Sequence, residues 1–108
     1  MRLKSPTVNI RFLRNEFWQP LFELDEFWRK EVGYEVVITS ANDSTHLEHS
    51  RHYLGEAIDI RTWIAERGGH QLFGTRRETI LIESRKIMGK FFQILDEDDH
   101  FHIAYIGA

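Results

Sequence analysis

Residues 100–106, HFHIAYI, set the pattern that decides the fold, because polar and apolar side chains alternate along them. Successive side chains of a β-strand point to opposite faces, so the two histidines share one face with Ala104. The stretch AIDIRT at residues 57–62 repeats the pattern, with Asp59 and Ala57 on one face and isoleucines on the other. Each strand therefore offers an apolar face to a core, and a polar face with room beside a small alanine to a cleft.

A helix is expected before these strands, at residues 15–31, where apolar residues recur at helical spacing among glutamates. Asn15 is the expected N-cap, and Gly33 is the expected end of this helix. Pro20 falls inside the segment, which indicates either a late start or a bend.

The remaining apolar runs predict the rest of the sheet. Further strands are expected at residues 34–39 (YEVVIT) and 91–95, the latter followed by the acidic turn DEDD at 96–99. Thr75 is expected to cap a second helix that runs to about Lys90. Consecutive strands near the end favour antiparallel pairing, so the expected fold class is α+β, a small antiparallel sheet with flanking helices.

The composition limits the classes of protein to which this chain can belong. With 108 residues, 42% of them hydrophobic and 13% aromatic, the chain suits one compact domain spanning residues 1–108. The formal net charge is −3 and both signs are interspersed, which argues against a nucleic-acid-binding domain. No run approaches the roughly 20 apolar residues of a membrane span, and the first residues lack the apolar core of a signal peptide. We therefore expect a monomer, made in the cytoplasm, without a membrane span.

Histidine is abundant, with six in the chain, and cysteine is absent, so any metal must be held by nitrogen and oxygen ligands. Three histidines lie in the polar segment SANDSTHLEHSRHYLGE at residues 40–56, which is long for a simple turn of a small domain. His46 and His49 are interpreted as polar loop residues, and His70 as an exposed residue of a glycine-rich loop. Trp63, just after the second alternating stretch, is either a core residue or one wall of a substrate groove.

Two histidines and one carboxylate form a ligand set that suits catalytic zinc. They supply three donors at roughly 2.0–2.2 Å and leave the fourth position to water. Zinc-bound water loses a proton near neutral pH, which makes a nucleophile available. A nearby carboxylate can then carry that proton to the leaving amine.

The stretch SRHYLGEAID at residues 50–59 carries the motif S-x-H-x-x-G-x-A-x-D. It resembles the zinc D-Ala-D-Ala carboxypeptidases and their relatives, which include phage cell-wall endopeptidases and share a fold with the hedgehog signalling domain. The stretch DHFH at residues 99–102 resembles the second motif of that superfamily, an acid followed by H-x-H near the C-terminus. The resemblance covers residues 17–106.

This resemblance implies a hedgehog/DD-peptidase fold and a zinc metallopeptidase, a hydrolase acting on the peptides of bacterial peptidoglycan. It makes His52, Asp59 and His102 the zinc ligands. It makes Asp99 the catalytic base, and it implies that His100 stabilises the oxyanion that forms on attack. A small domain of this kind also resembles the endolysins and tail-associated enzymes of phages, which act at the cell wall after release.

The identity of the base stays open among three acids. Strict strand alternation places Asp99 on the face opposite His100, so Asp99 can serve only if the chain bends or bulges before His100. Glu97 and Asp98 are the competing acids. Asp99 is preferred because the family has an acid three residues before the last ligand.

The sequence departs from the family pattern at one place. Relatives often carry an arginine after the strand that corresponds to YEVVITS, where it holds a substrate carboxylate, but residues 40–44 contain none. Arg51 or Arg61 could substitute, and the departure favours an endopeptidase over a carboxypeptidase. The alternative function is a catalytically inactive domain of the same fold that binds zinc or a partner.

Overall fold

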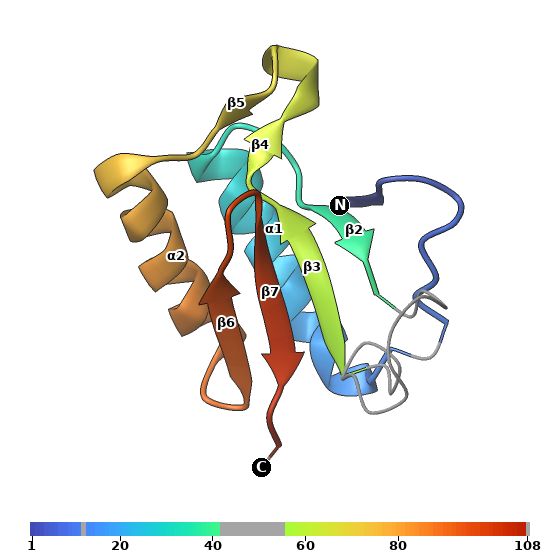
Figure 1. Cartoon of the computed structure of the whole chain (residues 1–108). Helices are drawn as coiled ribbons and strands as arrows, with labels where there is room; N and C mark the ends of the chain where they lie inside the picture. The colour runs from blue at the N-terminus through green and yellow to red at the C-terminus, as the bar shows by residue number, and fades with distance from the viewer. Residues whose placement is uncertain (12, 42–55, 108) are drawn as a thin grey trace.

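The computed structural model describes residues 1–11, 13–41 and 56–107, and a five-stranded sheet with two helices forms most of this part (Figure 1). In spatial order, the strands of the sheet are β1 (Arg2–Leu3), β2 (Val37–Ser40), β3 (Ala57–Arg61), β7 (His100–Tyr105) and β6 (Phe92–Asp96). The helices are α1 (Trp18–Glu31), which follows a 3-10 turn at Asn15–Phe17, and α2 (Gly74–Met88). After β3, the strands β4 (Trp63–Ile64) and β5 (His70–Gln71) form a hairpin around a 3-10 turn at Ala65–Arg67.

The sheet is mixed rather than purely antiparallel, which corrects the sequence-based expectation. Strand β1 pairs parallel to β2, and the other neighbouring pairs of this sheet are antiparallel. No pattern in the sequence predicts β1, because its two residues are too few to show alternation. The α+β class is confirmed, and β3, β6 and β7 lie within one residue of their expected bounds.

Both helices pack on the same face of the sheet (Figure 1). Phe101 and Ile103 of β7 point into this core with the isoleucines of β3, and all of them are fully buried. Trp28 of α1 meets Phe101 edge-on, with 6.1 Å between the ring centroids. The Trp28 indole also donates from Nε1 to Ser84 Oγ of α2 at 3.2 Å, which ties the two helices together over the sheet.

Helix α1 accommodates its proline and does not use the expected cap. Pro20 lies in the first turn, where a backbone N–H has no partner within the helix, so its missing donor costs little. Asn15 lies in the preceding 3-10 turn and Phe17 occupies the N-cap position, so the prediction of Asn15 as the cap is wrong. Gly33 has a φ of 82° and donates to the Trp28 carbonyl at 3.0 Å, which confirms that it ends the helix.

Helix α2 also differs from expectation at both ends. It begins at Gly74 with Phe73 at the N-cap position, and no side-chain hydrogen bond caps it, so the prediction of Thr75 as the cap is wrong. It ends at Met88, because Gly89 leaves the helical region with a φ of 86°. Four apolar residues of this helix are buried in the core or packed against it: Ile80, Leu81, Ile87 and Met88.

Candidate metal centre

The face of the sheet opposite the helices carries the candidate ligands, and we call it the outer face. It is formed by Ala57, Asp59 and Arg61 of β3 and by His100, His102 and Ala104 of β7, which pair across the two strands in antiparallel register. Residues directly opposite each other in such a ladder share a face. The alternation predicted from the sequence is therefore confirmed for both strands.

Asp59 and His102 are direct neighbours on the outer face. They occupy matching positions of β3 and β7, and Asp59 Oδ1 lies 2.9 Å from His102 Nδ1. The exposed fraction is 17% for the Asp59 side chain and 23% for the His102 side chain. Both groups are thus shielded by neighbours while still accessible from outside.

This pair fits the donor geometry of a zinc ion. Two ligand atoms at roughly 2.0–2.2 Å from a tetrahedral metal are about 3.3 Å apart, only a few tenths of an ångström more than the observed separation. A carboxylate oxygen and an imidazole nitrogen are also donor types that zinc takes in the absence of cysteine. The separation of the two donor atoms is therefore compatible with one shared ion.

The third predicted ligand, His52, lies outside the described residues, as do His46, His49 and Arg51. Within the described residues, no group of three or more histidine, aspartate or glutamate side chains has the arrangement of a metal site. The described part of the chain thus contains two of the three predicted ligands, and they adjoin each other. The role of His52 stays a prediction.

His100 lies beside this pair and is held by Asp99. Its Nε2 is 3.8 Å from Asp59 Oδ1, and its Nδ1 is 2.7 Å from Asp99 Oδ1. A carboxylate on Nδ1 fixes the orientation of the imidazole and leaves Nε2 directed at the Asp59–His102 pair. The four side chains therefore form a chain of polar contacts along the outer face.

The backbone bends at Asp98 and Asp99, immediately before β7 begins. The Asp99 carbonyl accepts a hydrogen bond from the Thr62 amide at 3.1 Å, which fixes the bend against the end of β3. The strand alternation therefore does not extend to Asp99, whose carboxylate lies 2.7 Å from His100 Nδ1, and its role as the base stays a prediction. Asp98 and Glu97 are exposed, and neither carboxylate has a recorded contact with His100 in the described structure.

Arg77 holds the turn that carries Asp99, and sequence reasoning missed it. From α2, its guanidinium donates to Asp96 Oδ1 at 2.6 and 3.0 Å and to the Glu97 carbonyl at 2.5 Å. It also donates to Thr62 Oγ1 and the Leu72 carbonyl, each at 3.0 Å. One side chain thus joins α2, the end of β3 and the acidic turn. No local pattern identifies it, because its partners Thr62, Asp96 and Glu97 lie 15, 19 and 20 residues away in the sequence.

A pocket of about 230 Å³ adjoins His100 on the outer face. Its walls are Lys4, Thr39, Arg61, Trp63, Asp99 and His100. Trp63 therefore lines a pocket that adjoins His100, and its role as a wall of a substrate groove stays a prediction. A larger hollow of about 710 Å³ lies between α2 and β6, but none of the candidate ligands is among its described walls.

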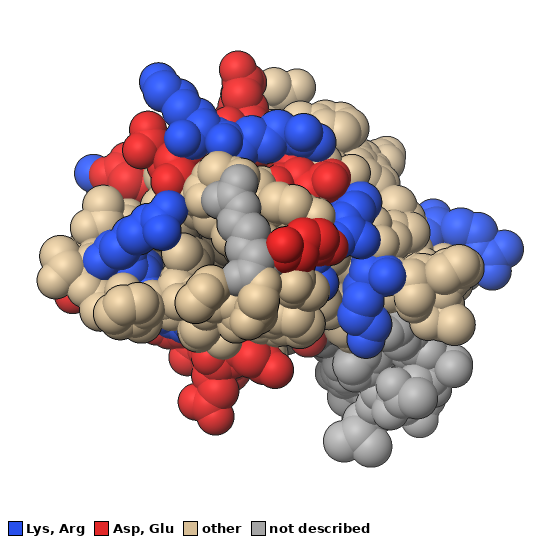
Figure 2. Space-filling view, turned by 90° about the horizontal axis from the view of Figure 1, so that it is seen from above, with Lys and Arg blue, Asp and Glu red and all other residues tan. Residues whose placement is uncertain are grey.

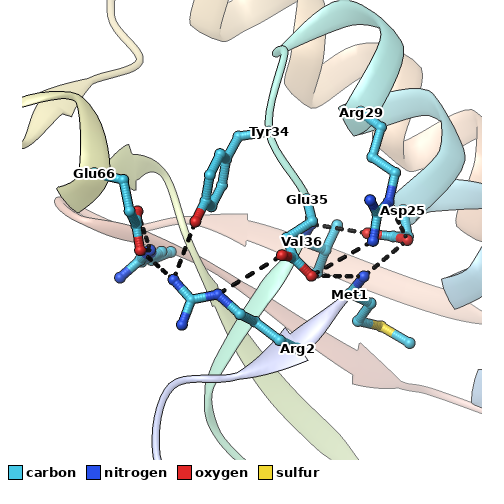
Figure 3. A network of polar contacts seen from close by, with 9 residues as sticks. Met1, Arg2, Asp25, Arg29, Tyr34, Glu35, Val36 and Glu66 are labelled. Atoms are coloured by element: carbon cyan, nitrogen blue, oxygen red, sulfur yellow. Dashed lines mark hydrogen bonds and ion pairs between the residues drawn. The ribbon is translucent and has the colours of Figure 1, made fainter.

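Arg61 is buried between Trp63 and Glu66 near this pocket. Its guanidinium lies 4.8 Å from the Trp63 ring centroid, and its Nη2 is 3.0 Å from Glu66 Oε2. Figure 3 shows that Glu66 also pairs with Arg2. The Arg2 guanidinium also donates to the Tyr34 hydroxyl at 3.2 Å. A backbone hydrogen bond at Glu66, helped by Tyr34 and Arg61, lowers the pKa of the Glu66 carboxyl. Glu66 is therefore a stable anion shared by two guanidinium groups.

The charges of both signs are intermingled over the end of the molecule that carries the β4–β5 hairpin (Figure 2). Among the described residues, no helix is long and apolar enough to cross a membrane.

Comparisons of this chain with models of protein families, with curated proteins and with solved structures find no match. Function is therefore inferred from the motif residues and their geometry.

Proposed function

We propose that this protein is a zinc-dependent peptidase with a hedgehog/DD-peptidase fold, acting on the peptides of bacterial peptidoglycan. The observation that carries the proposal is the contact of 2.9 Å between Asp59 and His102 on neighbouring strands, with His100 and Asp99 beside it. These are the residues that the two sequence motifs single out. Their meeting on one face of the sheet supports the interpretation that they act together.

Asp59 and His102, together with His52, would hold the zinc ion. Zinc bound there would supply a Lewis acid for the scissile carbonyl and would make water more acidic. Asp59 and His102 are positioned by the register of β3 and β7, which the buried residues on the other face of the same strands fix. The ligand positions are therefore rigid, as a metal site requires.

Asp99 acts as the base that takes a proton from the attacking water and returns it to the leaving amine. Its exposed fraction of 69% leaves the carboxylate accessible to water and substrate. When His100 is protonated, both its ring nitrogens are donors. Its Nδ1 then holds Asp99, while Nε2 faces the place where negative charge develops on the carbonyl oxygen.

The test is metal analysis combined with cleavage of purified peptidoglycan. We expect one zinc per chain and the appearance of new amino groups, with both lost in His52→Ala, Asp59→Ala and His102→Ala. His70→Ala is the matched control, because His70 is an exposed histidine on β5 and should change neither. Absence of stoichiometric zinc, or activity unaffected in His52→Ala, would overturn the proposal.

Variants of the three acids test the assignment of the base. Asp99→Asn should lower the rate of cleavage by about 10²- to 10⁴-fold, the usual contribution of a general acid–base residue, and should leave zinc content unchanged. Asp98→Asn and Glu97→Gln should retain nearly full activity. Cleavage lost in either of these, but kept in Asp99→Asn, contradicts the assignment. Bound zinc without cleavage in the unmodified protein would instead indicate a non-enzymatic zinc-binding domain.

A further inference from the structure

Strand β6 forms one edge of the five-stranded sheet, so its only neighbour among the described strands is β7 (Figure 1). On the side of β7, the Ile106 amide donates to the Phe91 carbonyl at 2.8 Å. In an antiparallel ladder, the backbone groups of successive residues point alternately to one side of the strand and to the other. The register with β7 therefore directs the backbone groups of Phe92, Ile94 and Asp96 to the free edge of the sheet.

This free edge retains unused hydrogen-bonding groups. The Phe92 amide donates to the Gly89 carbonyl at 3.2 Å, and the Ile94 carbonyl accepts from Arg85 Nη2 at 2.8 Å. The Ile94 amide and the Phe92 carbonyl have no such partner within the part of the chain that the structure describes. The strand also contains none of the prolines or lysines that commonly block an edge. A further strand can therefore pair with β6.

Helix α2 and the turn after it bring positive charge to this free edge. Between residues 85–90 and β6 lies the hollow of about 710 Å³, which we call the edge groove. Its described walls include no acid and three cationic residues, Arg85, Lys86 and Lys90. Lys86 pairs with Glu83 at 3.1 Å, whereas Arg85 and Lys90 form no ion pair with any described residue. The edge groove therefore attracts anionic groups.

The outer face is apolar beside the edge groove. Leu95 and Ile106 line the groove and are 41% and 48% exposed. Residues directly opposite each other in a ladder share a face of the sheet. In a strand added to β6, the residues opposite Phe92 and Ile94 would therefore lie on the side of α2. The residue between them would lie on the outer face, the face of Leu95.

We propose that the edge groove binds an extended segment of a partner protein, which adds a strand to β6 and alternates carboxylate with apolar side chains. The unused backbone groups of β6 favour an extended chain, as in other cases of β-strand addition. The three cations favour carboxylates on the side of α2. Leu95 favours apolar side chains on the outer face.

A second copy of this chain is the competing occupant. Pairing of two β6 strands would bring two sets of the same three cations to one junction, and their repulsion opposes it. An acidic segment meets no such repulsion. The proposal does not rest on the peptidase function, because none of Asp59, Asp99, His100 and His102 is among the described walls of the edge groove.

Three peptides of five residues, the length of β6, serve as probes, each acetylated at its N-terminus and amidated at its C-terminus. The first alternates valine with glutamate and begins and ends with valine. The second has glutamine in place of glutamate, which removes the charge. The third is the first peptide with a methyl group on each glutamate nitrogen, which keeps the charge but removes the amide donors that would face β6. The set therefore tests charge and strand pairing separately.

NMR titration of the full chain measures the affinity of each peptide, and hydrogen exchange follows the Ile94 amide. We expect the glutamate peptide to bind at least about fivefold more tightly than the glutamine peptide, as suits partly exposed ion pairs. We expect it to bind about tenfold more tightly than the methylated peptide, because two hydrogen bonds are lost there. The glutamate peptide should also slow exchange of the Ile94 amide.

Variants of the two lysines test the source of the charge preference. Lys86→Gln combined with Lys90→Gln should lower the preference for glutamate over glutamine to about twofold or less. Both lysines are exposed, so these changes leave the core intact. Lys30→Gln is the matched control, because it removes an exposed lysine of α1 that is not among the described walls of the groove.

The inference is overturned if the glutamine or the methylated peptide binds as tightly as the glutamate peptide, or if no peptide binds. It is also overturned if the double lysine variant keeps the full preference. Sedimentation of the chain as a dimer, with the Ile94 amide protected before any peptide is added, would identify a second copy as the occupant and would overturn it as well.

Discussion

Replacement of Arg77 by alanine is expected to destabilise the protein strongly, although Arg77 is a charged residue near the surface. Only 13% of its side chain is exposed, and its guanidinium lies 5.2 Å from the ring centroid of Phe101 in the core. It donates to side chains and carbonyls from three separate parts of the chain. Alanine would leave these acceptors without their donor and would release the acidic turn from α2.

The magnitude follows from the partners that lose their donor. Three part-buried acceptors lose their donor, and each is worth about 1 kcal/mol when left unsatisfied. They are the Leu72 carbonyl, the Thr62 hydroxyl and the Gln71 side-chain carbonyl. The ion pair with Asp96 adds at most about 1 kcal/mol, because Asp96 is 41% exposed and solvent screens it. The expected loss in the free energy of unfolding is therefore about 3–4 kcal/mol for Arg77→Ala.

Urea denaturation followed by tryptophan fluorescence measures this loss, and Arg76→Ala is the matched control. Arg76 is the neighbouring residue, but it is exposed, and its side-chain hydrogen bonds among the described residues go to two carbonyls at the end of α1. We expect Arg76→Ala to cost about 1 kcal/mol or less. If Arg77→Ala costs no more than Arg76→Ala, Arg77 does not hold the turn, and the placement of Asp99 needs another explanation.

The remaining predictions concern one carboxylate and one buried hydroxyl. Burial raises the pKa of Asp25, but hydrogen bonds from Arg29 and a backbone amide outweigh it and leave the pKa below its ordinary value of 3.8. A depressed folded-state pKa stabilises the protein above that ordinary value, and this stabilisation is lost as the pH falls through the folded pKa. Asp25→Asn should therefore lower stability at pH 7 and remove part of its acid dependence in urea denaturation, whereas Glu26→Gln should do neither. Ser84→Ala should cost about 1–2 kcal/mol, because it leaves the Trp28 indole N–H buried without an acceptor, and a loss below 0.5 kcal/mol in the same assay would contradict this.

The outer face could be predicted from sequence because a strand has a simple period. Polar and apolar residues alternate at 57–62 and at 100–106. If each strand packs one side on a core, this alternation alone predicts which side chains face outward. It assigned Asp59 to the polar face of one strand and His100 and His102 to the polar face of another, and the pairing of β3 with β7 brings these faces together. The same period gave the wrong face for Asp99, because a bend precedes His100 and the alternation does not extend through it.

The other differences from expectation have tertiary causes. Asn15 and Thr75 have the right residue types for helix caps. The N-cap positions are nevertheless occupied by Phe17 and Phe73, because the helices begin at other residues than the local pattern indicates. Strand β1 exists only because residues far along the chain pair with it, through hydrogen bonds such as that from Arg2 N to the Val36 carbonyl at 3.0 Å. Lys4 acquires its place beside the pocket through this pairing. The pocket could therefore not be assembled from local patterns.

The core and the candidate site constrain each other through the register of β3 and β7. Ile60 faces Phe101 and Ile58 faces Ile103 on the buried side, while Asp59 faces His102 on the outer side. A slip of one residue would turn the apolar set of one strand outward and bury its polar set, which costs far more than any contact on the outer face contributes. The burial of four large apolar side chains therefore maintains the 2.9 Å contact between Asp59 and His102. Substitutions that conserve the volume of these core residues should then preserve the site, even though they lie on the opposite side of the sheet.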